Sequence, residues 1–240
     1  MFSFSRASPY YSISPTLTGE QNLLMLNPGL SSVPPPKHNS PITRVTTFES
    51  KYKKNYLNYM KEYLSHYTPG SSNCDFGTGQ RLSGTIHNSC KFPLELLGPC
   101  LDPENYITHT DNACFYLKLN KIFGYVPDIE GNKITVRCKA KLSRDSDHLG
   151  QPVYYPSVEA DNETLGYFSS APFPYIRQSD YQTPLLAVTF PNIKRNQVIG
   201  VSCVSTNLPD HTAYSFEVSV DTNETIPVKE NSIFTNMLIY

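Results

Sequence analysis

Alternating apolar and polar residues mark several short strands along the chain. Phe115, Leu117 and Leu119 alternate with more polar neighbours, which is the two-residue period of a strand with one buried face. The same period occurs in residues 134–138, 198–204 and 214–220, and residues 185–190 form a continuous apolar run. A continuous run is typical of a central strand. The pattern therefore predicts a mostly β protein.

One segment has a helical period instead. Its aromatic and apolar residues recur every three or four positions and predict one amphipathic helix with this stripe facing the core: Phe48, Tyr52, Tyr56, Tyr59, Met60, Tyr63 and Tyr67. Thr46 and Glu49 have the spacing of a capping box, so we expect the helix to begin there. Pro69 and Gly70 are expected to end it, and its lysines, Lys51, Lys53, Lys54 and Lys61, to face solvent.

Composition agrees with a single β-rich body. A chain of 240 residues with 39% apolar content can bury one core. Charged residues make up only 17%, whereas there are 17 tyrosines and 20 prolines, a mixture that favours strands and fixed turns. The net charge is −1, so the chain lacks the basic field that a nucleic-acid partner requires.

The cysteines indicate an oxidising compartment. There are six, and none forms the close CxxC pairs of a zinc site. We therefore expect disulfides, although the sequence alone does not choose among the possible pairings. Two glycosylation sequons, at Asn162 and Asn223, fit the same compartment. Together these features predict a secretory-pathway ectodomain.

No arrangement typical of catalysis is present. The motifs GxSxG and HExxH are absent, and the six histidines are scattered without ligand spacing. We expect no catalytic residue, no metal site and no cofactor in this chain.

Several blocks resemble one family. Residues 90–127, CKFPLELLGPCLDPENYITHTDNACFYLKLNKIFGYVP, are similar to the ectodomain of the β subunit of the sodium/potassium-pumping ATPase and of its proton/potassium relative. Residues 181–190, YQTPLLAVTF, and residues 201–204, VSCV, resemble later blocks of the same family in the same order. The resemblance runs from about Leu26 to Val220.

The resemblance implies an architecture. The disulfides would join Cys74 to Cys90, Cys100 to Cys114 and Cys138 to Cys203. The separation of the last pair is like that of the disulfide between the two sheets of an immunoglobulin domain, although tryptophan is absent. We expect a mainly β, immunoglobulin-like sandwich with one amphipathic helix and long disulfide-stapled loop insertions. Residues 1–45 would form a disordered leader and proline-rich stalk, residues 46–220 the sandwich, and residues 221–240 an unassigned extension.

The resemblance also implies a function. A non-catalytic accessory (β) subunit would bind the catalytic α subunit of a sodium/potassium-transporting ATPase, support its folding and export to the plasma membrane, and modulate potassium transport. Phe173, Pro174 and Tyr175 match an aromatic segment tied to that assembly, although Ile176 and Arg177 replace its Tyr-Gly end; together with Tyr181 they are the expected partner-binding residues. Two alternatives stay open: the β subunit of a proton/potassium pump, and a soluble adhesion or recognition glycoprotein of the same fold.

The expected location is the extracellular side of the plasma membrane, as in the type II ectodomains of the family. No apolar run in this sequence is long enough to cross a bilayer. We therefore expect the chain to associate with the membrane through its partner, or through a span that precedes this sequence.

Overall fold

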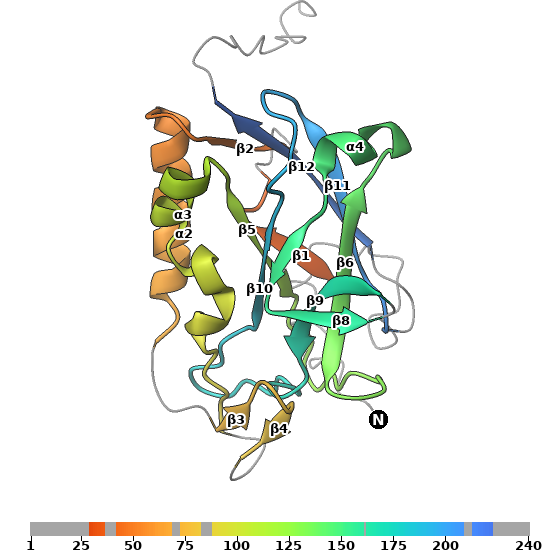
Figure 1. Ribbon diagram of the computed structural model, residues 1–240. Helices are drawn as coiled ribbons and strands as arrows, with labels where there is room; N and C mark the ends of the chain where they lie inside the picture. The colour runs from red at the N-terminus through yellow and green to blue at the C-terminus, as the bar shows by residue number, and fades with distance from the viewer. Residues whose placement is uncertain are drawn as a thin grey trace, which may run out of the picture.

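Two β-sheets packed face to face form the body of the protein, and helices cover one side (Figure 1). The computed structural model describes residues 29–36, 42–68, 73–82, 88–160, 162–208 and 213–222. The prediction of a mainly β sandwich with one long helix and disulfide-stapled loops is confirmed.

The smaller sheet has four antiparallel strands in the order β1-β5-β10-β7. Their bounds are Leu30–Val33 for β1, Cys114–Leu119 for β5, Leu185–Thr189 for β10 and Val153–Tyr155 for β7. Every residue of β10 is buried. The continuous apolar run therefore occupies an inner position, as the sequence predicts.

The larger sheet has six strands in the order β2-β12-β11-β6-β9-β8. Their bounds are Ile42–Thr46 for β2, Ala213–Asp221 for β12, Ile199–Ser205 for β11, Lys133–Ala140 for β6, Glu163–Ser169 for β9 and Ser157–Ala160 for β8. All neighbours are antiparallel except β2, which runs parallel to β12. Alternate residues of β6 and β11, such as Val136 and Val201, are buried in the core between the sheets.

Three helices cover the outer face of the smaller sheet (Figure 1). They are α2, Lys51–Ser65; the 3-10 helix η2, Leu94–Leu101; and α3, Pro103–Thr110. Buried hydroxyl groups tie them to the strands: Tyr56 of α2 donates to the Cys114 carbonyl at 2.6 Å, and Tyr116 of β5 donates to the Cys100 carbonyl at 2.6 Å.

Shorter elements lie at the two ends of the sandwich. The helices η3, Ser143–Asp145, and α4, Ser146–Leu149, lie at one end, and the small hairpin of β3, Cys74–Asp75, and β4, Gln80–Arg81, lies at the other (Figure 1). In the described part of the chain, no helix combines the length and the apolar character that a bilayer span needs.

Helix α2 begins later than its sequence predicts. Ser50 is the N-cap residue, and its hydroxyl accepts a hydrogen bond from the Lys53 N–H at 3.1 Å. The capping-box prediction is wrong because Thr46 is the last residue of β2, where its hydroxyl bonds to that of Ser50. Glu49 forms an ion pair with Lys53 at 3.1 Å instead of reaching back along the chain. Lys53 is consequently buried and not solvated.

The aromatic stripe of α2 is only partly a core face. Tyr56, Met60 and Tyr67 are buried, as predicted. Tyr52 and Tyr59, however, are 47% and 39% exposed. These two tyrosines belong to the stripe in sequence, but in the structure they lie at its margin, on the side of the helix that faces solvent.

The disulfides join Cys74 to Cys90, Cys100 to Cys114 and Cys138 to Cys203, the pairs that the family resemblance implies. One detail corrects the immunoglobulin comparison. Cys138 of β6 lies directly opposite Cys203 of β11 in the same sheet, with 4.0 Å between the Cα atoms. This bridge links two neighbouring strands and does not join the two sheets.

The sheets begin earlier in the chain than residue 46. Strand β1 and all but the last residue of β2 fall within residues 1–45, which the sequence predicts to form a leader and stalk. Pairing with β5 and with β12 holds them in the sandwich. Residues 1–28 and 223–240 lie outside the described residues, so the leader and the C-terminal extension stay predictions.

Candidate functional site

The expected partner-binding residues all lie on one loop, residues 170–184, between β9 and β10. Phe173, Pro174, Tyr175 and Tyr181 are each half-buried there, and the Phe173-Pro174 peptide bond is cis. The rings of Tyr175 and Tyr181 pack together, with 4.9 Å between their centroids. The loop therefore gathers the predicted residues on one surface.

A second segment, which follows β5, completes this surface. Phe123 forms a parallel β-bridge with Tyr175, and the Gly124 N–H donates to the Tyr175 carbonyl at 2.8 Å. Tyr125 packs its ring edge-on against Phe173, at 6.0 Å between centroids. We call the five half-buried rings of Phe123, Tyr125, Phe173, Tyr175 and Tyr181 the aromatic patch.

Cationic side chains lie over these rings. The Lys121 Nζ is 5.4 Å from the centroid of Tyr175 and 5.3 Å from that of Tyr181. The Arg177 guanidinium is 6.0 Å from the ring of Phe123. These distances lie within the range of cation–π attraction. The patch therefore combines aromatic rings with positively charged side chains.

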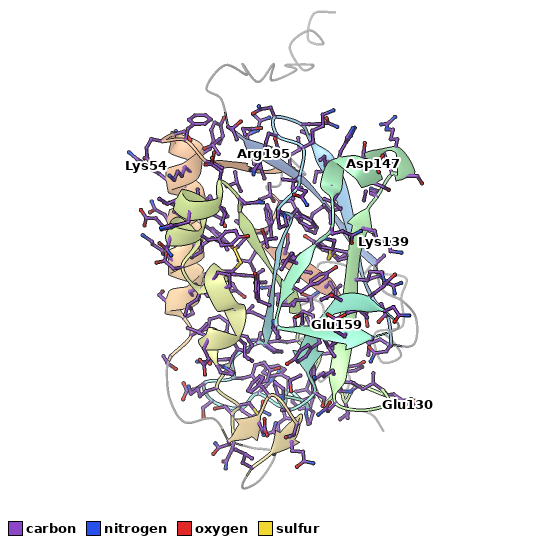
Figure 2. All side chains as sticks on the ribbon, in the orientation of Figure 1. Lys54, Glu130, Lys139, Asp147, Glu159 and Arg195 are labelled. Carbon is purple, nitrogen blue, oxygen red and sulfur yellow. A yellow bond between two sulfur atoms is a disulfide. The ribbon has the colours of Figure 1, made fainter. Side chains whose placement is uncertain are left out.

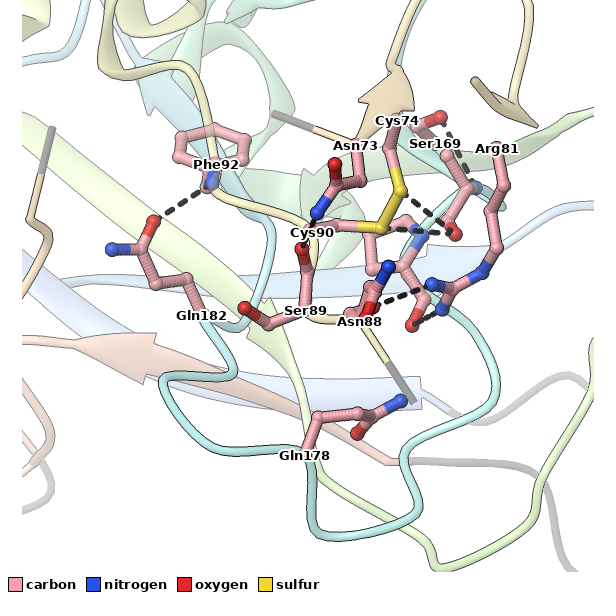
Figure 3. Close-up of a disulfide and its surroundings, with 12 residues drawn as sticks. Asn73, Cys74, Arg81, Asn88, Ser89, Cys90, Phe92, Ser169, Gln178 and Gln182 are labelled. Atoms are coloured by element: carbon pink, nitrogen blue, oxygen red, sulfur yellow. Dashed lines mark hydrogen bonds between the residues drawn. A yellow bond between two sulfur atoms is a disulfide. The ribbon is translucent and has the colours of Figure 1, made fainter. Parts of the chain in front are cut away.

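Buried hydrogen bonds anchor the loop to the helical side of the molecule. Gln182 accepts from the Phe92 N–H at 2.8 Å (Figure 3) and donates to the Thr68 carbonyl at 3.0 Å. The hydroxyl of Tyr67, near the end of α2, donates to the Thr183 carbonyl at 2.8 Å. The loop is thus held next to the segment that contains Cys90.

The hairpin beside the Cys74–Cys90 disulfide holds the other end of the loop. Arg81 of β4 donates to the Asn88 carbonyl at 2.7 Å and to the Pro172 carbonyl at 3.3 Å (Figure 3). Pro172 directly precedes Phe173. The disulfide therefore supports the position of the aromatic patch through Arg81.

Burial shifts the titration of two tyrosines of the patch. Burial raises the pKa of Tyr181, and burial, with a smaller effect of Asp128, raises the pKa of Tyr125 to about 12. A tyrosine hydroxyl is protonated near neutral pH at its ordinary pKa of about 10, and these shifts extend that state to higher pH. A patch of neutral rings and cations can make apolar, hydrogen-bonding and cation–π contacts with another surface. Within the described ranges, no group of three His, Cys, Asp or Glu side chains is arranged to hold a metal ion.

Sequence reasoning missed half of this surface. Lys121, Phe123 and Tyr125 lie within the block of residues 90–127 but are not among the predicted partner-binding residues, although they alternate with apolar or small residues beyond the end of the strand. That alternation is a signal for an extended segment. Its partner, the Tyr175 segment, is about fifty residues away and cannot be identified from a pattern within either segment alone.

The sequons lie away from the aromatic patch or outside the described residues. Asn162 is exposed in the turn between β8 and β9, in the left-handed conformation with φ 60°. Thr164 of the same sequon is also exposed, and its hydroxyl donates to Glu159 at 2.6 Å. Asn223 lies outside the described residues.

A sandwich with disulfide-stapled loops and a half-buried aromatic surface places the molecule among the disulfide-bonded β-sandwich domains. The comparison with known families is more specific. The family model described as the sodium/potassium ATPase beta chain matches residues 3–217. The chain belongs to this family.

Similar proteins have the same family name. Sodium/potassium-transporting ATPase subunit beta-1 of Drosophila melanogaster is 26% identical over 211 residues, covering 77% of this chain and 65% of the relative. Subunit beta-2 of the same organism is 26% identical over 229 residues, covering 79% and 67%. A probable subunit beta-3 of Caenorhabditis briggsae is 26% identical over 211 residues, covering 79% and 62%. The chain thus spans about two thirds of the length of these relatives.

Proposed function

We propose that this chain is a non-catalytic accessory subunit that binds the catalytic α subunit of a sodium/potassium-transporting ATPase. The aromatic patch is the contact surface in this proposal, with Phe173, Pro174, Tyr175 and Tyr181 as its partner-binding residues. Family membership supports the class of partner, and the gathering of these rings on one anchored loop supports the site. Transport chemistry would belong entirely to the partner.

Binding of this kind can influence a pump in two ways. A folded, disulfide-bonded domain that covers apolar surface on a newly made catalytic subunit would support its folding and its export to the plasma membrane. A domain that binds one pump conformation more tightly than another shifts the population toward that conformation. We propose that modulation of potassium transport arises from such differential contact, on the extracellular side of the membrane.

The six cysteines and the exposed Asn162 support the assignment of this side. Disulfides persist in the oxidising secretory pathway. Asn162 and Asn223 are proposed as glycosylation sites, and loss of a gel-mobility shift in Asn162→Gln after glycosidase treatment tests the first of them.

Co-purification tests the proposal. The full chain, carrying an added secretion signal, is expressed with an epitope-tagged sodium/potassium pump catalytic subunit, and the complex is captured in detergent. Tyr175→Ala combined with Tyr181→Ala should lower the recovered complex by about ten-fold or more, because truncated aromatic anchors lose most of their contact energy. Tyr52→Ala, at an exposed tyrosine on α2, is the matched control and should leave recovery unchanged. Equal recovery of the patch variant and the control would contradict this surface, and no recovery of the wild type would contradict the proposed partner.

A further inference from the structure

Two lysines at the margin of the aromatic patch contact aromatic rings and form no ion pair within the part of the chain that the structure describes. Lys118, in β5, holds its Nζ 5.5 Å from the ring centroid of Tyr63 on α2. Lys121, three residues further, lies over Tyr175 and Tyr181 at 5.4 and 5.3 Å. Both lysine side chains are partly exposed. Each of the two cations therefore lies against tyrosine rings.

Neither cation forms an ion pair with a described residue. The ion pairs of the described chain involve other lysines, arginines and a histidine. The charge of the pair is therefore uncompensated by the part of the chain that the structure describes.

The partial burial of Lys118 and Lys121 is unusual for charged side chains. Burial lowers the pKa of Lys121, and burial followed by the repulsion of Lys121 lowers the pKa of Lys118. Both remain cations near neutral pH, because the ordinary pKa of lysine lies far above it. Removing the remaining water from two cations without supplying an anion is costly, so a purely apolar surface would cover this site poorly.

Lysine is also an uncommon residue in a buried interface. Interfaces are depleted in lysine at their core unless the charge is paired across the contact. The tyrosines around the pair are suited to exclude water, and an ammonium–carboxylate contact strengthens when water is excluded. The site therefore fits a surface that brings its own carboxylate.

We propose that Lys118 and Lys121 form a receptor site for an acidic side chain, Asp or Glu, on the extracellular surface of the catalytic subunit. The inference rests on the proposed function and specifies the chemistry of its contact. The carboxylate contacts these ammonium groups, while the neighbouring tyrosines shield the contact from solvent. The pair thereby selects partners by charge, since a basic or uncharged segment leaves both cations unpaired.

Zero-length cross-linking tests the site directly. A water-soluble carbodiimide joins an amine to a carboxylate in contact with it, and the expelled water converts the reagent to a urea. The complex of the full chain with the tagged catalytic subunit is treated with the reagent, digested and examined by mass spectrometry. We expect an isopeptide bond between Lys118 or Lys121 and an Asp or Glu of the catalytic subunit.

Charge variants give an independent measurement. Lys121→Glu should lower the recovered complex about ten-fold or more, because two carboxylates would then face each other. Lys121→Arg keeps the cation and its stacking on the rings and should retain most of the complex. The matched control is Lys139→Glu on β6, whose side chain is exposed on the other side of the molecule from α2 (Figure 2).

The outcomes separate the two proposals. A complex that forms normally, yields no cross-link at either lysine and tolerates Lys121→Glu as well as Lys139→Glu overturns the acidic contact while leaving the proposed function intact. Failure of the wild-type chain to recover any catalytic subunit overturns both. Because the cross-link is measured on the wild type, the test does not depend on a variant that folds.

Discussion

Gln182 offers the sharpest test of how the fold holds the aromatic patch. This side chain is 6% exposed, and its carbonyl oxygen accepts the N–H of Phe92, a residue only 5% exposed, at 2.8 Å. Its amide group donates to the carbonyl of Thr68 at 3.0 Å. One glutamine thus connects the segment after α2, the Cys90 segment and the loop that contains Tyr181; Figure 3 shows its bond to Phe92.

The perturbation is Gln182→Met, which keeps the length of the side chain and removes both polar groups. The Phe92 N–H then stays buried without an acceptor, which costs about 1 to 3 kcal/mol. Thr68 is exposed, so water replaces the lost bond to its carbonyl at little cost. We expect the free energy of unfolding to fall by about 2 kcal/mol, and for a chain of this size the melting temperature to fall by roughly 4 to 8 °C.

The assay is thermal and urea unfolding of the oxidised protein, followed by circular dichroism. Hydrogen exchange at the Phe92 amide provides a local measurement, because an amide without its acceptor exchanges faster when the loop opens. Gln151→Met, at an exposed glutamine, is the matched control and should be nearly neutral. If Gln182→Met is as stable as this control and the Phe92 amide keeps its protection, the reasoning about Gln182 is refuted.

Two further predictions concern the disulfides and the buried tyrosines. Replacing Cys138 and Cys203 by Ser should lower the free energy of unfolding by about 4 kcal/mol, and replacing Cys100 and Cys114 by Ser should lower it by about 3 kcal/mol. The first loss is larger because the sequence separations of the two pairs are 65 and 14. Chemical denaturation of the two variants measures both losses, and the reverse order would contradict the prediction. Burial raises the pKa of Tyr154 from 10.0 to about 12, so its contribution to stability is complete below pH 10 and is lost as the pH rises toward 12, with a slope of up to about 1.4 kcal/mol per pH unit. In urea unfolding across this pH range, the free energy of unfolding should decline less steeply with pH for Tyr154→Phe than for the wild type. Identical slopes for the two proteins would contradict this role of Tyr154.

The sequence predicts the strands and the long helix well because each depends on a short-range period. The alternation of Ile199, Val201 and Cys203 coincides with a buried face of β11. The predicted start of α2 is wrong because the residues of the apparent capping box are also compatible with a strand. Only the pairing of β2 with β12 decides that Thr46 belongs to the sheet. That pairing joins residues far apart in the chain.

The candidate site is predictable only in part for the same reason. Phe173, Pro174, Tyr175 and Tyr181 follow from a family resemblance within one segment. The role of Lys121 depends instead on which rings the fold brings beneath its ammonium group. A lysine is ordinarily a solvated side chain, so the sequence around Lys121 does not show that its ammonium group lies over aromatic rings.

The topology explains why the lysines and the tyrosines meet at one end of the sandwich. Strands β5 and β10 are antiparallel neighbours, and Lys118 near the end of β5 lies opposite Leu185 at the start of β10. The segment that leaves β5 and the loop that enters β10 must therefore emerge at the same end of the two strands. A shift of this register by one residue would turn the Lys118 side chain toward the core and bury a charge. The register that the apolar core requires is thus also the one that places Lys118 and Lys121 beside the aromatic patch, so selection for a stable sandwich preserves the geometry of the proposed contact.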